Sequence, residues 1–151
     1  MLSVIEKVVF LQNVDIFSRV PTEQLAYVAA IAEEVTFLNN DVIFKEHDAS
    51  DALYIVIDGK VRLHRGDDEI TVAGPREAFG AWALFDDQPR LVTATVLEDC
   101  RLLQIDRDDF ADLLADHIQI TQGIMKNIVV RLRGLVGQVA NSASEERRTA
   151  Q

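Results

Sequence analysis

Residues 79–93 read Phe-Gly-Ala-Trp-Ala-Leu-Phe-Asp-Asp-Gln-Pro-Arg-Leu-Val-Thr and form the most informative segment of the chain. Gly80 opens a segment suited to a short helix, whose N-terminus would offer unpaired N–H donors to an anion. Arg90 follows a turn fixed by Pro89, where its guanidinium can fold back over the same donors. This pairing suits a phosphate group, although on spacing alone the alternative is a turn with a solvent-facing arginine.

Around this stretch, short apolar runs alternate with turn residues from Glu34 to Arg107. Asn, Asp, Gly and Pro separate the runs because they tolerate positive φ, bond to their own backbone or fix φ. Asp58-Gly59 is the strongest hairpin signal. The connections are too short for parallel crossovers, so we expect an antiparallel sandwich or jelly roll. The expected strands are residues 35–38, 42–44, 53–57, 61–64, 69–72, 92–96 and 101–105.

Helical periodicity flanks these strands on both sides. Residues 3–12 and 22–33 carry apolar residues at helical spacing, and Pro21 stands where the second helix can begin. Asp106 is a candidate N-cap for a helix after the strands. A last helix is expected over residues 118–139.

The last helix carries a coiled-coil spacing, with alternating steps of three and four at Met125, Ile128, Leu132, Leu135 and Val139. The spacing predicts a homodimer through residues 125–139, while packing on the chain's own barrel remains the alternative. Both arrangements can hold at once. Residues 141–151 read as a disordered tail.

The stretch from Phe79 to Arg90 resembles the phosphate-binding cassette of the cyclic nucleotide-binding domain family, usually Phe-Gly-Glu-Leu-Ala-Leu, a variable stretch and Pro-Arg. Residues 44–48 and 54–61 are similar to the family's second to fourth strands, and residues 97–103 to the strand before its distal helices. The residues that match the cassette are Phe79, Gly80, Ala83, Leu84, Pro89 and Arg90.

The resemblance covers residues 10–140 and implies a mainly β fold with flanking α-helices. It implies an eight-stranded antiparallel jelly-roll barrel with N-terminal helices and a long C-terminal helix. The expected domain is residues 1–140, divided into a helical start (1–33), a β-roll (34–105) and C-terminal helices (106–140).

The resemblance also implies a function, that of a small-molecule-sensing regulatory domain for a cyclic nucleotide such as cAMP or cGMP. Leu135 and Val136 fall where the family's last helix forms a lid over the barrel mouth. The implied ligand-binding residues are Gly80, Ala81, Trp82, Ala83, Arg90 and Leu91.

Three cassette residues depart from the family pattern. Ala81 replaces the acidic residue that accepts a hydrogen bond from the ribose 2′-hydroxyl. An unpaired buried hydroxyl costs on the order of 1–3 kcal/mol, or roughly tenfold to hundredfold in affinity. Leu91 replaces a small residue, and Trp82 replaces a typical Leu. Asn40 and His47 occupy turns where the family usually has Gly, and both residue types adopt positive φ more readily than most.

Two hypotheses therefore stay open at this point. In the first, the cassette binds a cyclic nucleotide or another phosphate-bearing or anionic small molecule. In the second, the domain is degenerate and ligand-free, and serves protein–protein interaction or dimerisation. Retention of Arg90 favours the first, whereas Ala81, Trp82 and Leu91 favour the second.

Length, charge and composition limit the partners and the cellular location that this protein can have. The 151 residues suit one domain, and 25 acidic against 15 basic residues give a net charge of −10. This charge disfavours nucleic acid and anionic membranes as partners. No apolar run approaches the length of a membrane span, and Cys100 is the lone cysteine, so we expect a cytoplasmic protein without membrane insertion.

The sequence offers little for catalysis. His47, His64 and His117 include no close pair for a catalytic metal. No nucleophile motif of the Gly-x-Ser-x-Gly kind is present. We therefore expect no catalytic residue, no metal site and no cofactor, and a protein that is not an enzyme.

Overall fold

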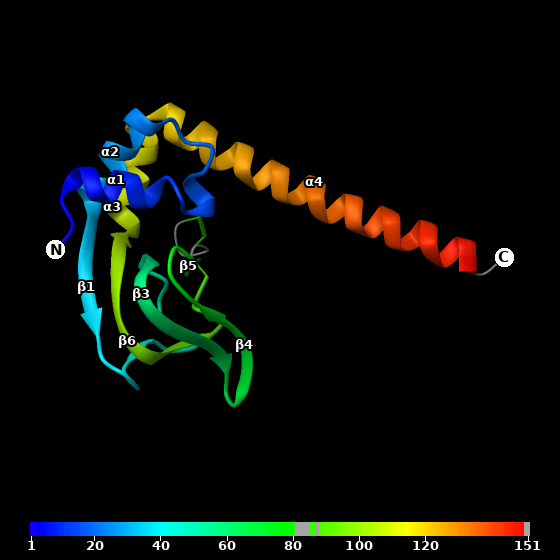
Figure 1. Ribbon diagram of the computed structural model, residues 1–151, viewed down its shortest axis with the longest axis horizontal. Coiled ribbons are helices and arrows are strands. Elements are labelled where there is room, and N and C mark those ends of the chain that lie inside the picture. Colours follow the sequence, from blue (N-terminus) through cyan, green and yellow to red (C-terminus); the bar gives the residue numbers. More distant parts are fainter. Residues whose placement is uncertain (81–84, 87, 150–151) are drawn as a thin grey trace.

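The computed structural model describes residues 1–80, 85–86 and 88–149, which form a curved sheet with helices packed at one end (Figure 1). All strand pairs are antiparallel. The mainly β, jelly-roll class with flanking helices is thereby confirmed. In chain order the elements are α1 (Val4–Leu11), the 3-10 helix η1 (Asp15–Phe17), α2 (Thr22–Ile31), β1 (Ala32–Phe37), β2 (Val42–Phe44), β3 (Ala52–Arg65), β4 (Asp68–Ala73), β5 (Ala78–Phe79), β6 (Thr93–Asp106), α3 (Arg107–Asp116) and α4 (Ile118–Thr149).

Within the described residues the sheet has six strands rather than the eight expected. Its order is β1-β6-β3-β4, with β2 paired to β6 and β5 paired to β3. The count differs because β3 and β6 are 14 residues long and each contains two of the expected strands. These two strands pair from Ala52↔Asp106 to His64↔Thr93 and form the centre of the sheet.

The Asp58-Gly59 hairpin prediction was wrong. The dipeptide lies inside β3, where the register against β6 shifts on both sides of Asp58. Gly59 has φ +96°, and a Cβ there would lie 2.5 Å from Cys100 Cβ. Gly59 is therefore a bulge that bends β3 closely over β6, and a bulge demands the same residue types as a tight turn.

The central strands separate two hydrophobic cores. Leu53 and Ile55 of β3 belong to the core under the helices, together with Phe17 and Phe110. The alternate residues Ala52, Tyr54 and Val56 belong to the core within the sheet. Since side chains alternate across a strand, burial of both faces explains why this part of β3 reads as a continuous apolar run.

Side-chain caps fix where the helices begin. The Ser3 hydroxyl accepts from the Glu6 N–H, and the Glu6 carboxylate accepts from the Ser3 N–H, each at 3.1 Å. These bonds lower the pKa of Glu6. The predicted N-cap at Asp106 is confirmed, because its carboxylate accepts from Asp108 N at 2.8 Å and from Asp109 N at 3.4 Å.

The first part of α4 packs on the body of the domain. Ile120 and Ile124 are buried in the helical core, and Asn127 is 5% exposed. Gly123 lies so close to the loop between η1 and α2 that a Cβ added at Gly123 would meet Arg19 O at 2.7 Å. These contacts fix the direction in which the rest of α4 extends.

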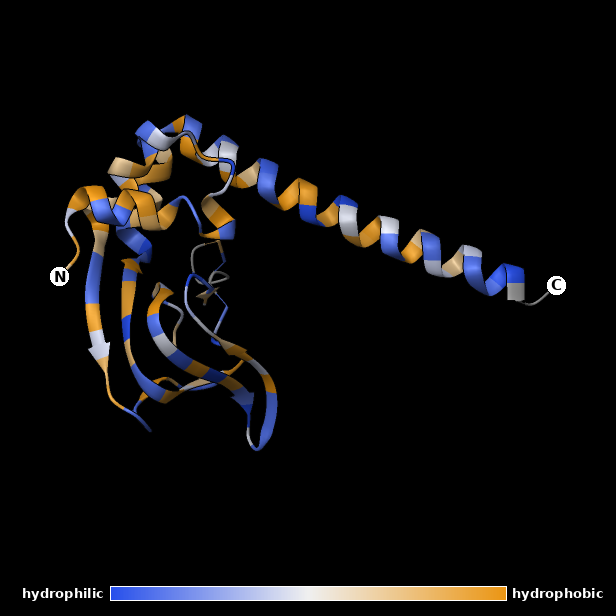
Figure 2. Cartoon of the chain, viewed as in Figure 1, coloured by the Kyte–Doolittle hydropathy of each residue, from blue (hydrophilic) through white to orange (hydrophobic). Residues whose placement is uncertain are grey.

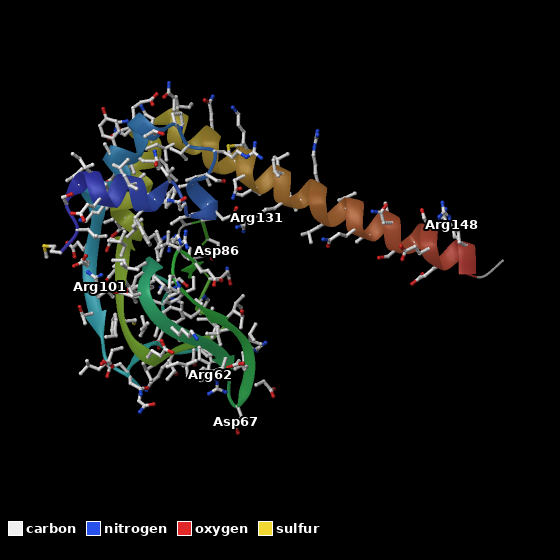
Figure 3. The ribbon with its side chains drawn as sticks, viewed as in Figure 1. Arg62, Asp67, Asp86, Arg101, Arg131 and Arg148 are labelled. Atoms are coloured by element: carbon white, nitrogen blue, oxygen red, sulfur yellow. The ribbon has the colours of Figure 1, made fainter. Side chains whose placement is uncertain are left out.

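The rest of α4 projects away from the body (Figure 1), with apolar and polar residues alternating along it (Figure 2). Arg131 lies where α4 leaves the body, and Arg148 lies near its far end (Figure 3). Residues 141–149, expected as part of a disordered tail, are helical to Thr149. This segment has no Gly or Pro, and Arg147 and Arg148 favour the C-terminal end of a helix. None of the described helices has the length and apolar character needed to cross a membrane.

Candidate functional site

Arg90 is a buried cation in the segment between β5 and β6. The residue is only 5% exposed, and its Cζ lies 4.0 Å from the centre of the Phe44 ring. Phe44 in turn packs with Tyr54 and Phe79, at centroid distances of 6.0 Å each. The guanidinium therefore lies on an aromatic cluster inside the sheet, where a cation–π contact is strengthened by the absence of water.

The backbone of Arg90 is held by the turn that follows β2. Arg90 N donates to Asp48 O at 2.8 Å, and Arg90 O accepts from His47 N at 2.9 Å. His47 has φ +75° and Asn40 has φ +74°, as expected for turns in which both replace the family's usual glycine. The unusual backbone at His47 therefore positions the arginine.

Gly80 gives the guanidinium the space it needs. Gly80 has φ +78°, and a Cβ there would lie 2.5 Å from Arg90 Nη1. Nη1 donates to Gly80 O at 3.4 Å, and Nη2 donates to Ala52 O at 2.7 Å. The glycine is thus required both by its left-handed backbone and by the close approach of the arginine.

The positive charge of Arg90 is incompletely compensated. Asp51 lies 3.5 Å from Nη2, but its side chain is 80% exposed. Arg90 Nε is buried and has no hydrogen-bond partner among the described residues. Burial lowers the pKa of Arg90, while Tyr54 and Asp51 oppose that shift. A buried cation with an unpaired N–H donor favours the binding of an anion.

An aromatic series links the cassette to the helices. Phe85 contacts Phe110 of α3 edge-on, with ring centroids 6.4 Å apart. Phe110 also contacts Phe17 of η1 at 6.4 Å. The segment between Gly80 and Arg90 is therefore in direct contact with the elements on which α4 rests.

The other predicted site residues are distributed differently. Ala81, Trp82 and Ala83 lie outside the described residues. Leu91 is 65% exposed, beside Arg90 in the chain but directed towards solvent. The predicted lid residues are Leu135 and Val136, which lie on the projecting part of α4 and are 58% and 67% exposed. The structure does not bring these lid residues to Arg90.

Apart from Gly80, the residues that contact the guanidinium were not found from the sequence. Asp51 and Ala52 are 39 and 38 positions away from Arg90, and Phe44 contributes through its ring alone. No local pattern marks these three residues, because each contact forms only when β2, β3 and the cassette are brought together.

Two further expectations concern reactive groups. Among the described residues no three His, Cys, Asp or Glu side chains are grouped as metal ligands. Cys100 is buried in the core of the sheet, and burial raises the pKa of its thiol. A buried thiol with a raised pKa is a poor nucleophile.

Comparison with known proteins agrees with this geometry. The profile of the cyclic nucleotide-binding domain family matches residues 34–117. The CRP-like cAMP-activated global transcriptional regulator of Mycobacterium tuberculosis is 30% identical over 128 residues, which cover 82% of this chain and 57% of that protein. The chain thus spans little more than half the length of this curated relative.

Solved structures show the same fold. The N-terminal domain of a transcriptional regulator from Streptomyces coelicolor has a TM-score of 0.77 and 32% identity, over 86% of this chain and 94% of that one. The regulatory domain of Toxoplasma gondii PKA, crystallised with cAMP, has a TM-score of 0.66 and 27% identity, over 71% of this chain and 42% of that one.

The fold defines a jelly-roll domain with flanking helices, in which a buried arginine lies between β5 and β6. The chain belongs to the cyclic nucleotide-binding domain family.

Proposed function

We propose that this domain is a regulatory module that binds the phosphate of a cyclic nucleotide, or of a related small molecule, at Arg90. The observation that carries the proposal is the buried guanidinium, whose Nε has no acceptor among the described residues. The relatives named for cAMP activation or crystallised with cAMP support cAMP as the first ligand to test.

The sequence of the cassette predicts weak binding of any ribonucleotide. Ala81 has no carboxylate to accept the ribose hydroxyl, which costs roughly tenfold to hundredfold in affinity. The ligand must also compete with the carbonyl groups of Gly80 and Ala52 for the terminal nitrogens of Arg90. Both effects act on affinity and leave the basis of phosphate recognition intact.

Titration calorimetry with cAMP and cGMP tests this function. Wild-type protein should release saturable heat at millimolar ligand, and Arg90→Lys should lose most of the affinity because a point charge replaces a planar fork. Ala81→Glu should tighten binding if the ribose contact alone is missing. Arg62→Lys is the matched control, since Arg62 lies near the β3–β4 hairpin (Figure 3) and bonds to Asp67 O at 3.1 Å.

Three outcomes contradict the proposal or refine it. Absence of heat from the wild-type protein contradicts nucleotide binding, as does unchanged affinity in Arg90→Lys. An Ala81→Glu variant without gain assigns the weakness to Trp82 and Leu91. Thermal unfolding of each variant shows whether the fold is retained.

Helix α4 is the proposed output of the module. We infer that it forms a homodimer through residues 125–139, since all five seam residues are exposed, from Ile128 at 42% to Val139 at 70%. Phe85 and Phe110 connect the cassette to the base of this helix. Binding would draw Leu135 and Val136 towards the barrel mouth, which hydrogen exchange would detect as ligand-dependent protection of residues 132–139.

A second function, a ligand-free dimerisation module, is favoured by one observation. Both terminal nitrogens of Arg90 already donate to backbone carbonyls, so the arginine also serves as a link between β3 and the cassette. In that case Arg90→Lys would lower stability and leave every titration flat.

A further inference from the structure

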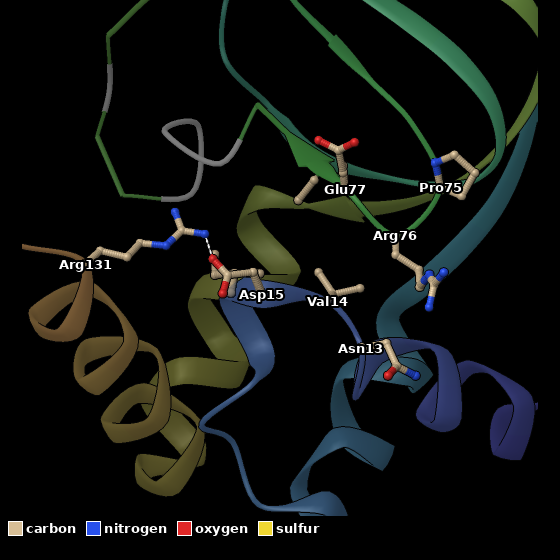
Figure 4. Close-up of a pocket in the computed structure, with 9 residues that line it drawn as sticks. Asn13, Val14, Asp15, Pro75, Arg76, Glu77 and Arg131 are labelled. Carbon is tan, nitrogen blue, oxygen red and sulfur yellow. Dashed lines mark ion pairs between the residues drawn. The ribbon is translucent and has the colours of Figure 1, made fainter. Parts of the chain in front are cut away.

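A separate cavity of about 460 Å³ lies between η1, the β4–β5 turn and α4 (Figure 4). This volume is in the range of small-molecule sites. It shares no residue with the described contacts of Arg90, so it is distinct from the cassette. Its apolar part is formed by Val14, Ile16, Pro75 and Ala78, and its polar part by Asn13, Asp15, Arg76, Glu77 and Arg131.

Arg76 is the unusual residue of this cavity. Its φ is +71°, and it is one of three non-glycine residues with positive φ in the described part of the chain. The other two, Asn40 and His47, are of types that adopt this region several-fold more often than most. Arg76 N bonds to Val56 O at 2.8 Å, which pins the strained turn to β3. A strained backbone at an arginine makes its side chain a candidate for a functional role.

Among the described residues, Arg76 is the arginine of this cavity that has no protein partner, and its side chain is exposed. Arg131 and Arg76 lie on opposite sides, and Arg131 is paired with Asp15 (Figure 4). The Glu77 carboxylate accepts from Gly74 N at 3.2 Å within its own turn. No hydrogen bond or ion pair of the Arg76 guanidinium is found within the described residues. A guanidinium fork beside an apolar surface suits a carboxylate or phosphate attached to an apolar body.

The geometry points to a second ligand site here, for a small oxyanion-bearing molecule with an apolar portion, held by Arg76 and closed on the far side by Arg131. A ligand in this cavity touches η1, the turn before β5 and α4 together. It therefore holds α4 in its present direction.

Titration with benzoate and with inorganic phosphate, followed by amide chemical shifts, tests the site. Benzoate supplies a carboxylate on an apolar ring, whereas phosphate supplies the oxyanion alone, so the two probes separate the two chemistries. Saturable shifts are expected at Ile16 and Ala78, with benzoate the tighter probe. Arg76→Asn keeps a residue suited to positive φ, removes the guanidinium, and should weaken binding tenfold to hundredfold.

Two controls separate this site from the cassette and from general charge. Arg133→Gln removes a cation of the same type from the projecting part of α4 and should leave the affinity unchanged. Arg90→Lys should also leave it unchanged, so that failure of nucleotide binding and failure of this site are distinguishable. Arg76→Asn should raise the melting temperature as well, because it relieves backbone strain.

The proposal is overturned by either of two results. One is the absence of saturable shifts at Ile16 and Ala78 with both probes up to about 50 mM, well above the millimolar affinity of a weak specific site. The other is wild-type affinity in Arg76→Asn, which would mean that the arginine is merely tolerated at this turn.

Discussion

Two faces of α4 have the same kind of composition but different environments. The docked face, with Ile120, Ile124 and Asn127, is buried against η1 and the loop that follows it. The seam face, defined by Met125, Ile128, Leu132, Leu135 and Val139, lies about a quarter turn away and is exposed. The difference shows that an apolar helix face is buried only where another part of the protein packs against it. It also agrees with the proposed dimer, in which α4 docks on its own body and presents the seam face to a second copy.

The largest expected effect is on assembly, through the seam face. Leu132→Asp places a carboxylate at the centre of the proposed dimer and should weaken association by more than about a hundredfold. Light scattering should then show a dimer for the wild type and a monomer for the variant. A wild-type protein that is monomeric at high concentration, with no change in the variant, would leave the seam face without its proposed partner.

The second largest effect is expected on the free energy of unfolding, from a substitution in the docked face. Ile124→Ala should lower the free energy of unfolding by about 2–5 kcal/mol, because Ile124 is 2% exposed and its removal leaves a cavity. Ile118→Ala is the matched control, since Ile118 is 68% exposed and lies outside the seam. Urea unfolding measures both, and equal losses would contradict the distinction between buried and exposed positions on this helix.

Alanine substitutions at Gly123 and at Gly134 should change stability in opposite directions. Gly123→Ala should destabilise the protein by about 1–3 kcal/mol, because the added Cβ meets Arg19 O at 2.7 Å and Val20 Cγ2 at 2.8 Å. A Cβ added at Gly134 would meet no atom within 4 Å beyond its chain neighbours and the backbone of its own helix. Gly134→Ala should therefore strengthen the projecting helix by about 0.5–1 kcal/mol, seen as slower hydrogen exchange of nearby amides. The same sign at both positions would contradict the docked arrangement.

The smallest effect on stability is expected from the ion pair between Asp15 and Arg131, at the end of the docked part of α4. Asp15→Asn removes the ion pair with Arg131, whose side chains are 64% and 60% exposed. An exposed pair of this kind contributes about 0–1 kcal/mol, so unfolding should shift only slightly and less in high salt. A loss as large as that of Ile124→Ala would mean that this pair, rather than burial, fixes the direction of α4.

Prediction from the sequence succeeded where the information is local. The antiparallel strand pattern, the cap at Asp106 and the strained turns at Asn40 and His47 follow from residues close in the chain. It failed at Asp58-Gly59, where a bulge and a hairpin demand the same residues, and at residues 141–149, which are helical. The strained turn at Arg76 was missed because arginine carries no signal for positive φ.

The residues of the candidate site also fall into those that the sequence motif predicted and those that only the structure shows. The cassette pattern identified Gly80 and Arg90, but it did not identify Phe44, Asp51 or Ala52 as the groups around the guanidinium. Those contacts depend on strands that meet only in the folded domain.

The family, the antiparallel pairing of the strands and the arginine of the cassette follow from the sequence alone, since turn chemistry and motif spacing are properties of neighbouring residues. The tertiary structure decided which donors of Arg90 are already used, which face of α4 is buried and where a second cavity opens. Burial and hydrogen-bond satisfaction are set by groups distant in the chain, as with Ala52, whose carbonyl oxygen accepts a hydrogen bond from Arg90 Nη2 although the two residues are 38 positions apart.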